Sequence, residues 1–190
     1  DYQYHGANHL GANSLLSCIF SGLFVAPGVS NRLKSLKNGS ASDLSATFFE
    51  KEVDKHTAAY KALLARPNKG ENPYLLHQEL GDVMTRSATV VRYNNQLQEA
   101  YGKVAEMLER VKNCSLSDHG NWTNQNVVFT RALADMIPIA LAILKGALQR
   151  DESRGAHYKP DFSFPSLKET DPAARRREAE QWCDNFEANT

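Results

Sequence analysis

The sequence lacks several features that would place it in a familiar class of protein. Its 22 basic residues are balanced by 22 acidic ones, so the composition gives no reason to expect a nucleic acid or an anionic membrane surface as a partner. No apolar run approaches the roughly 20 residues that a membrane span requires. The first residues contain no basic region like that of a signal peptide. These absences favour an ordinary soluble protein.

Cysteine is also scarce. Cys18, Cys114 and Cys183 are odd in number and widely separated, and none of them forms the CxxC spacing of a redox or zinc motif. We therefore expect reduced thiols in a cytosolic compartment. His5 and His9 stand four residues apart, but the glycines around them disfavour a helix and no carboxylate is close in the sequence. We expect no metal site.

Apolar residues make up 42% of the 190 residues, which is enough for one core-bearing domain. They recur at helical spacing in four segments, and no long alternating pattern is present. These segments cover residues 43–65, the residues after a cap at Asn72 with Pro73 in the first helical position, residues 94–112 and residues 126–150. We predict a mainly α fold, an antiparallel bundle of three to four helices.

The two ends of the chain differ from the bundle. An apolar helix is expected over residues 13–25, and the run Ala26-Pro27-Gly28 predicts its end. Residues 29–45, rich in Ser, Asn, Gly and Lys, are predicted to be a linker, and residues 46–165 the helical bundle domain. Residues 166–190 are predicted to be a tail, either a solvated helix or a frayed end.

The first motif is HGANHLGANSLLS, residues 5–17. Its small residues allow a backbone to approach a flat ligand closely, and its glycines tolerate turns with positive φ. Asn13 or Ser14 is expected to cap the following helix, whose free N–H groups and positive end favour an anion or an electron-rich ring. The alternative is a tight glycine-rich turn before a helix, without a ligand.

The second motif is RDESRGAHYK, residues 150–159, at the end of the long fourth helix. One interpretation is helix capping, with Gly155 in the C′ position and Arg150 and Arg154 near the negative helix end. The other is a charged network of Arg150, Glu152, Arg154 and His157 that docks the bundle onto another domain. The two interpretations are compatible.

Both motifs resemble those of one known family, the flavoprotein subunit of succinate dehydrogenase and fumarate reductase. The first is similar to the family's HGAN-Arg-LG-[AG]-NSLL, and residues 150–162, RDESRGAHYKPDF, are similar to R-x-ESRGAHYR-x-D-[FY]. The resemblance covers essentially this whole chain but only about the last third of such a protein. It implies that residues 1–28 are a carboxyl-terminal remnant of an FAD-binding domain.

The resemblance also implies roles for individual residues. Ser14 and Leu15 would contact FAD, and Asn13 would support the turn. His9 stands where the family carries an arginine that binds a substrate carboxylate. A histidine cannot repeat the bidentate geometry of arginine, so this position differs from the family pattern. A divergent active site, a variant position and an altered substrate preference all remain open.

For the parent protein the resemblance implies interconversion of succinate and fumarate by hydride transfer to FAD. Electrons would pass to an iron–sulfur subunit, and membrane-anchor subunits would hold the complex on the inner face of the plasma membrane. The family's catalytic residues and its GxGxxG motif are expected upstream of Asp1, so the 190 residues alone are expected to be inactive. The alternatives are a related FAD enzyme such as L-aspartate oxidase and a stand-alone helical interaction module.

Overall fold

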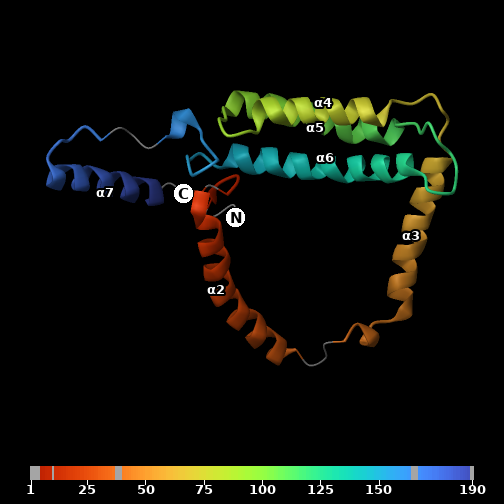
Figure 1. The fold of residues 1–190 in the computed structure, drawn as a ribbon, viewed down its shortest axis with the longest axis horizontal. Helices are drawn as coiled ribbons and strands as arrows, with labels where there is room; N and C mark the ends of the chain where they lie inside the picture. Colours follow the sequence, from red (N-terminus) through yellow and green to blue (C-terminus); the bar gives the residue numbers. More distant parts are fainter. Residues whose placement is uncertain (1–4, 10, 37–39, 164–166, 189–190) are drawn as a thin grey trace.

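The computed structural model describes residues 5–9, 11–36, 40–163 and 167–188, which form helices joined by loops (Figure 1). Three helices lie side by side in a bundle: α4 (Pro73–Ser87), α5 (Asn94–Arg110) and α6 (Gln125–Gln149). The described residues contain three isolated β-bridges and no β-strand. The expected helical bundle is therefore confirmed.

The core of the bundle is built from apolar side chains that recur every three or four residues on each helix. Burying a large aliphatic side chain stabilises a fold by about 1.5–3 kcal/mol, so these faces dominate the stability of the bundle. The largest fully buried members are Leu76, Leu97, Val104, Met107, Leu133, Ile137 and Leu144.

Local signals explain where two of these helices begin. The side chain of Asn72 accepts a hydrogen bond from the backbone N–H of Tyr74 at 2.9 Å, and Pro73 occupies the first turn, as predicted. Asn124 caps α6 in the same way by accepting from the N–H of Val127 at 3.1 Å. Each cap satisfies an N–H group that has no partner inside its helix.

An arginine ties the carboxyl end of α5 to α4 and to the loop before it. Arg110 donates to both carboxylate oxygens of Glu79, at 2.9 and 2.7 Å, and also pairs with Glu71. These hydrogen bonds raise the pKa of Arg110, which stays charged. These ion pairs fix the position of α5 along α4.

The first helix, α2 (Ser14–Ser35), is longer than the sequence predicts. The prediction that Ala26-Pro27-Gly28 ends it was wrong, and the first part of the predicted linker, residues 29–35, is helical. Pro27 removes a single backbone hydrogen bond, and the helix-compatible residues that follow, up to Lys34, supply further ones.

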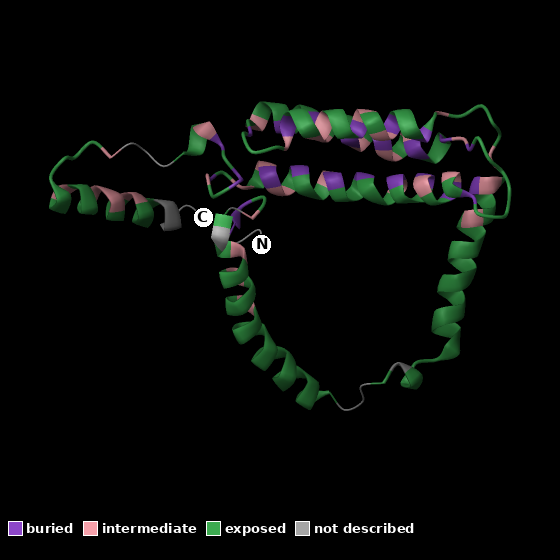
Figure 2. Cartoon of the chain, viewed as in Figure 1, coloured by how far each residue is buried: buried purple, intermediate pink, exposed green. Residues whose placement is uncertain are grey.

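The remaining helices lie outside the bundle. α3 (Ala46–Leu64) touches it through Leu63, which packs on Leu116 and Val127. α7 (Pro172–Ala188) is largely exposed, which confirms the solvated helix predicted for the tail. Figure 2 shows buried residues in the bundle and at the turn beside its end, whereas α2 and α3 are almost entirely exposed.

Within the described residues, the helices α2 and α6 are long and apolar enough to cross a membrane by length and composition. This corrects the expectation that no segment approaches that length. α6 carries a face of the bundle core, and 33% of the residues in its most apolar 18-residue stretch are buried. In the most apolar stretch of α2, no residue is buried. Length and composition do not distinguish a membrane span from a helix that packs in protein.

Candidate functional site

The two sequence motifs meet at one end of the bundle, where α6 ends. α6 stops at Gln149, and Arg150 takes the C-cap position. Gly155 lies beyond it in a tight turn, with φ +55°, so its predicted role as the C′ residue of the helix was wrong. The turn is closed by backbone hydrogen bonds of 2.8 and 3.0 Å between Arg154 and His157. The positive φ explains why glycine occupies this position.

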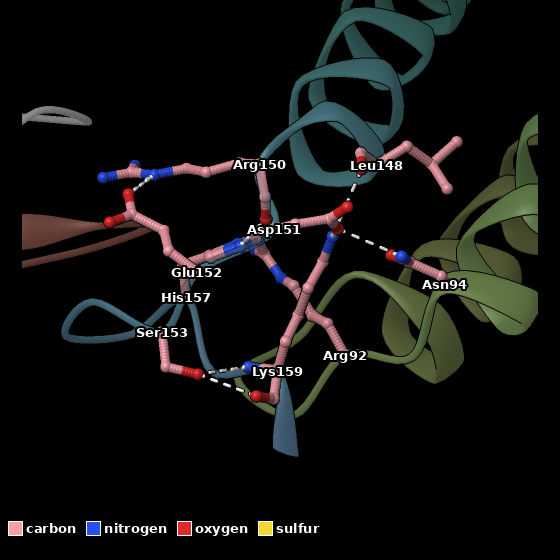
Figure 3. Close-up of polar contacts among 9 residues, drawn as sticks. All are labelled: Arg92, Asn94, Leu148, Arg150, Asp151, Glu152, Ser153, His157 and Lys159. Carbon is pink, nitrogen blue, oxygen red and sulfur yellow. Dashed lines mark hydrogen bonds and ion pairs between the residues drawn. The ribbon is translucent and has the colours of Figure 1, made fainter. Parts of the chain in front are cut away.

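Lys159 performs the capping that the sequence analysis assigned to other residues (Figure 3). Its side chain is 1% exposed, and Nζ donates to the carbonyl of Leu148 at 3.2 Å and to Asp151 Oδ1 at 2.8 Å. Asn94 donates to the same oxygen of Asp151 at 3.0 Å. A cation here also complements the negative end of the helix. Lys159 thus caps the end of α6, and Asp151, which it binds, links that end to Asn94 at the beginning of α5.

Asp151 stays ionised in this arrangement. Partial burial alone would raise the pKa of its carboxyl group, but the hydrogen bonds from Lys159 and Asn94 outweigh burial and lower the pKa. The pair Lys159–Asp151 therefore carries compensating charges at neutral pH.

Arg92 is a second residue that sequence reasoning missed. Its guanidinium donates to the carbonyls of Thr89 at 2.7 Å and Ala88 at 2.9 Å, at the end of α4, and to His157 Nδ1 at 2.8 Å. Because arginine cannot accept a hydrogen bond, Nδ1 of His157 must be the acceptor. His157 Nε2 then carries the proton and donates to the carbonyl of Arg150 at 2.9 Å.

These contacts require a neutral His157. Burial is the main cause that lowers its pKa below the ordinary value of 6.5, and the neighbouring charge of Arg92 acts in the same direction. His157 is 1% exposed. It serves as a neutral bridge between the loop after α4 and the segment after α6.

Glu152 completes the cluster. Its carboxylate is 10% exposed and pairs with Arg150 and, at 3.0 Å, with Arg154 Nη2. The four residues proposed for domain docking, which include His157, therefore do lie together. Their docking role stays a prediction.

The HGAN segment packs directly on this turn. The backbone N–H of Ala156 donates to the carbonyl of His5 at 3.3 Å, and both His5 and Gly6 are buried. Gly6 has φ +75°, and a Cβ atom at this position would lie 1.8 Å from the carbonyl oxygen of Arg154. Only glycine allows so close an approach. Two motifs separated by most of the chain therefore form one structural unit.

The residues predicted to face a ligand lie at the start of α2. Asn13 takes the N-cap position, as predicted, but its side chain makes no capping hydrogen bond. Ser14 Oγ bonds His9 Nδ1 at 2.6 Å, and Leu15 is 75% exposed. Gly11 has φ +60°, and among the described residues the space beside its Cα is open. The first turn of α2 is therefore accessible.

Other parts of the described chain offer less chemistry. No group of three His, Cys, Asp or Glu residues within it could hold a metal ion. A cavity of about 540 Å³ lies between α3 and α6, lined largely by apolar groups such as Phe48, Phe49 and Val53 together with Arg131. α3, which supplies most of its lining, meets the bundle at the end opposite the HGAN segment (Figure 1).

The fold and the site define a class: an all-α domain with a glycine-rich, helix-entry segment docked on a charged turn at one end of its bundle. Residues 77–188 match the family model described as fumarate reductase flavoprotein C-term. That match spans more than half of the chain. The chain therefore belongs to the carboxyl-terminal family of the fumarate reductase and succinate dehydrogenase flavoproteins.

Individual relatives agree with this assignment. The chain is 42% identical over 162 residues to the succinate dehydrogenase flavoprotein subunit of Bacillus subtilis, covering 85% of this chain and 27% of that protein. It is 31% identical over 161 residues to the fumarate reductase flavoprotein subunit of Haemophilus influenzae, covering 84% and 26%. The chain thus spans about a quarter of the length of these relatives.

Solved structures show the same fold. The Mycobacterium smegmatis Sdh1 complex in the apo form matches with a TM-score of 0.65 and 28% identity, over 85% of this chain and 26% of that one. An Escherichia coli quinol fumarate reductase matches with a TM-score of 0.63 and 26% identity, over 86% and 27%.

Proposed function

We propose that this chain is part of a flavoprotein subunit that interconverts succinate and fumarate. The observation that carries the proposal is the docking of the HGAN segment on the turn formed by residues 154–157, since both motifs resemble those of that family and lie together in one site. The relatives are named as succinate dehydrogenase or fumarate reductase flavoprotein subunits. They span a longer protein, which would supply the catalytic residues.

FAD is the proposed cofactor, and the start of α2 fits it. The accessible first turn, with Ser14 and Leu15, offers backbone N–H groups and the positive end of a helix of 22 residues to the electron-rich edge of a flavin. Asn13, at the N-cap position, would support this turn. When bound, FAD supplies the acceptor for a hydride from the substrate. The chain's own contribution is to present this turn.

His9 is the proposed contact to the substrate. It directly follows the residues His5-Gly6-Ala7-Asn8 and is partly exposed, and its imidazole is hydrogen-bonded to the hydroxyl of Ser14. A dicarboxylate would receive from it a single hydrogen bond in place of a bidentate arginine contact.

The exposed apolar faces of α2 and α3 are evidence that this chain is part of a larger protein. Leu15, Ile19 and Phe24 on α2 and Phe48 and Val53 on α3 are each at least 62% exposed. Faces of this size are rare on isolated domains and indicate contact with further protein. The relatives are about four times as long as the matched region, so an FAD-binding domain of the same polypeptide is the proposed cover.

The proposed partners follow from the same family. An iron–sulfur subunit would receive the electrons, and membrane-anchor subunits would hold the complex at the inner face of the plasma membrane. The relatives are named as subunits, in agreement with an assembly of several chains.

The test uses the full-length flavoprotein that contains this chain, expressed with FAD. Steady-state kinetics with succinate and fumarate, and inhibition by malonate, are measured for the wild type and for His9→Arg. If His9 replaces a carboxylate-binding arginine, His9→Arg should raise kcat/KM about tenfold to hundredfold, because a bidentate charged pair is stronger than one hydrogen bond.

The matched control is His56→Arg, the same change on the exposed face of α3. It should leave the kinetics unchanged. A wild-type protein that neither binds nor converts these dicarboxylates would contradict the proposed function. Activity in the wild type without a gain in His9→Arg would instead point to a site adapted to histidine.

A further inference from the structure

His5 is a buried histidine that the proposed chemistry does not use. Its residue is 3% exposed, and its ring stacks on the ring of His9, with centroids 4.6 Å apart and planes inclined by 20°. Its Nε2 lies 2.8 Å from Ser17 Oγ, one turn along α2 from the residue that binds His9. Both imidazoles are therefore fixed to the first turn of the same helix.

The hydrogen bonds assign the proton on His5. The hydroxyl of Ser17 donates its single proton to the carbonyl of Ser14 at 2.9 Å. Ser17 Oγ can therefore only accept from His5, so Nε2 of His5 carries the proton and donates. The relay runs from His5 through Ser17 to the backbone of Ser14, whose own hydroxyl bonds Nδ1 of His9.

The environment of His5 favours its neutral form. Burial is the main cause that lowers the pKa of His5, and the neighbouring His9 lowers it further. The position of His5 is fixed in turn from the other side, because its carbonyl accepts from Ala156 and the next residue, Gly6, is in contact with Arg154.

We propose that His5 is a positioning residue, which sets the plane of the His9 imidazole so that His9 meets the carboxylate of a bound dicarboxylate. This inference rests on the proposed function. The stack restricts rotation of the His9 ring, and Ser14 restricts it from the other edge. An oriented donor contributes more to binding than a freely rotating one, because less conformational freedom is lost when the ligand binds.

The experiment uses the full-length FAD-loaded flavoprotein. His5→Ala removes both the stack and the donor, His5→Phe keeps a ring without the donor, and Ser17→Ala removes the relay. Ser35→Ala is the matched control, since its hydroxyl also donates to the carbonyl three residues earlier, at the far and exposed end of α2. KM and kcat for succinate and the FAD content are measured for each variant.

We expect His5→Ala to raise KM about tenfold, with a smaller change in kcat and unchanged FAD content. His5→Phe should recover most of the loss, and Ser35→Ala should match the wild type. The decisive comparison is made in a His9→Ala background. There, His5→Ala should change KM by less than about twofold, because the group that it positions is gone.

The outcomes separate the two proposals. A wild type without dicarboxylate binding refutes the function, and with it this inference. An active wild type in which His5→Ala acts equally with and without His9, or lowers FAD content, gives His5 a merely structural role and overturns the inference alone. If His5→Ala does not fold, Ser17→Ala decides: it removes the contact that holds the His5 ring, so it should raise KM, and a KM like that of Ser35→Ala overturns the inference.

Discussion

Replacing Lys159 by methionine tests whether the end of the bundle is held by one buried ammonium. Methionine keeps an unbranched apolar stem of similar reach, so the change mainly removes the charge and its donors. The carbonyl of Leu148 and the carboxylate of Asp151 lose the hydrogen bond from Lys159, and Asp151 keeps the one from Asn94. The contact of Nζ with the ring of Phe162, 5.5 Å from its centroid, is lost as well.

The two losses differ in size. A partly buried carbonyl without a donor costs about 1–2 kcal/mol. The side chain of Asp151 is 51% exposed, so water replaces the ammonium and this loss is held to about 0.2–1 kcal/mol by solvent screening. Together they reduce the free energy of unfolding by about 2 kcal/mol, which lowers Tm by about 4–8 °C for a chain of this length.

Thermal unfolding of the 190-residue chain, followed by circular dichroism, measures the effect. Lys103→Met is the matched control, because Lys103 pairs with Glu99 at 2.6 Å on the exposed surface of α5. That variant should leave Tm almost unchanged. Equal values of Tm for the two variants would refute the reasoning, since burial is the main difference between the two ion pairs.

Three further predictions follow from other parts of the chain. Burial lowers the pKa of His157 in the folded chain below 6.5, so between the two pKa values the unfolded state binds more protons than the folded state. The free energy of unfolding should therefore fall as the pH drops below 6.5. Urea midpoints measured against pH should show this fall, and the curve for His157→Gln should be flatter. Residues 43–162 should fold alone as a helical bundle, and a circular dichroism spectrum of strand or coil would contradict this. Exposed Ile19 and Phe24 should drive self-association of the 190-residue chain, so Ile19→Lys combined with Phe24→Lys should shift its sedimentation towards a monomer, whereas a wild-type monomer would argue against it.

The bundle could be predicted from the sequence because its signals are local. Asn72 and Pro73 mark the beginning of α4 within four residues of chain, and the apolar spacing of α5 and α6 needs no knowledge of their partners. The end of α2 could not be predicted in this way. A proline gives a finite penalty, and the residues on both sides of Pro27 are compatible with a helix.

In the site, too, the residues with local signals were found and those with distant partners were missed. The cluster of Arg150, Glu152 and Arg154 was found because its residues are close in sequence. Arg92 was missed, because its contact with His157 spans 65 residues and nothing near Arg92 signals a partner. Lys159 lies inside the motif, so its position was a usable signal. Burial of a lysine is rare, however, and depends on acceptors that only the folded chain assembles.

The shape of the HGAN segment is determined by the bundle rather than by its own sequence. Gly6 has positive φ and touches the carbonyl of Arg154, so its conformation is fixed only when the turn of residues 154–157 is present. That turn depends on His157, which Arg92 holds from the loop after α4. A chain of contacts thus leads from the bundle to His5, whose ring lies against His9. Since a docked backbone and a buried ring leave the segment few alternative conformations, the bundle orders this end of the site before any ligand binds.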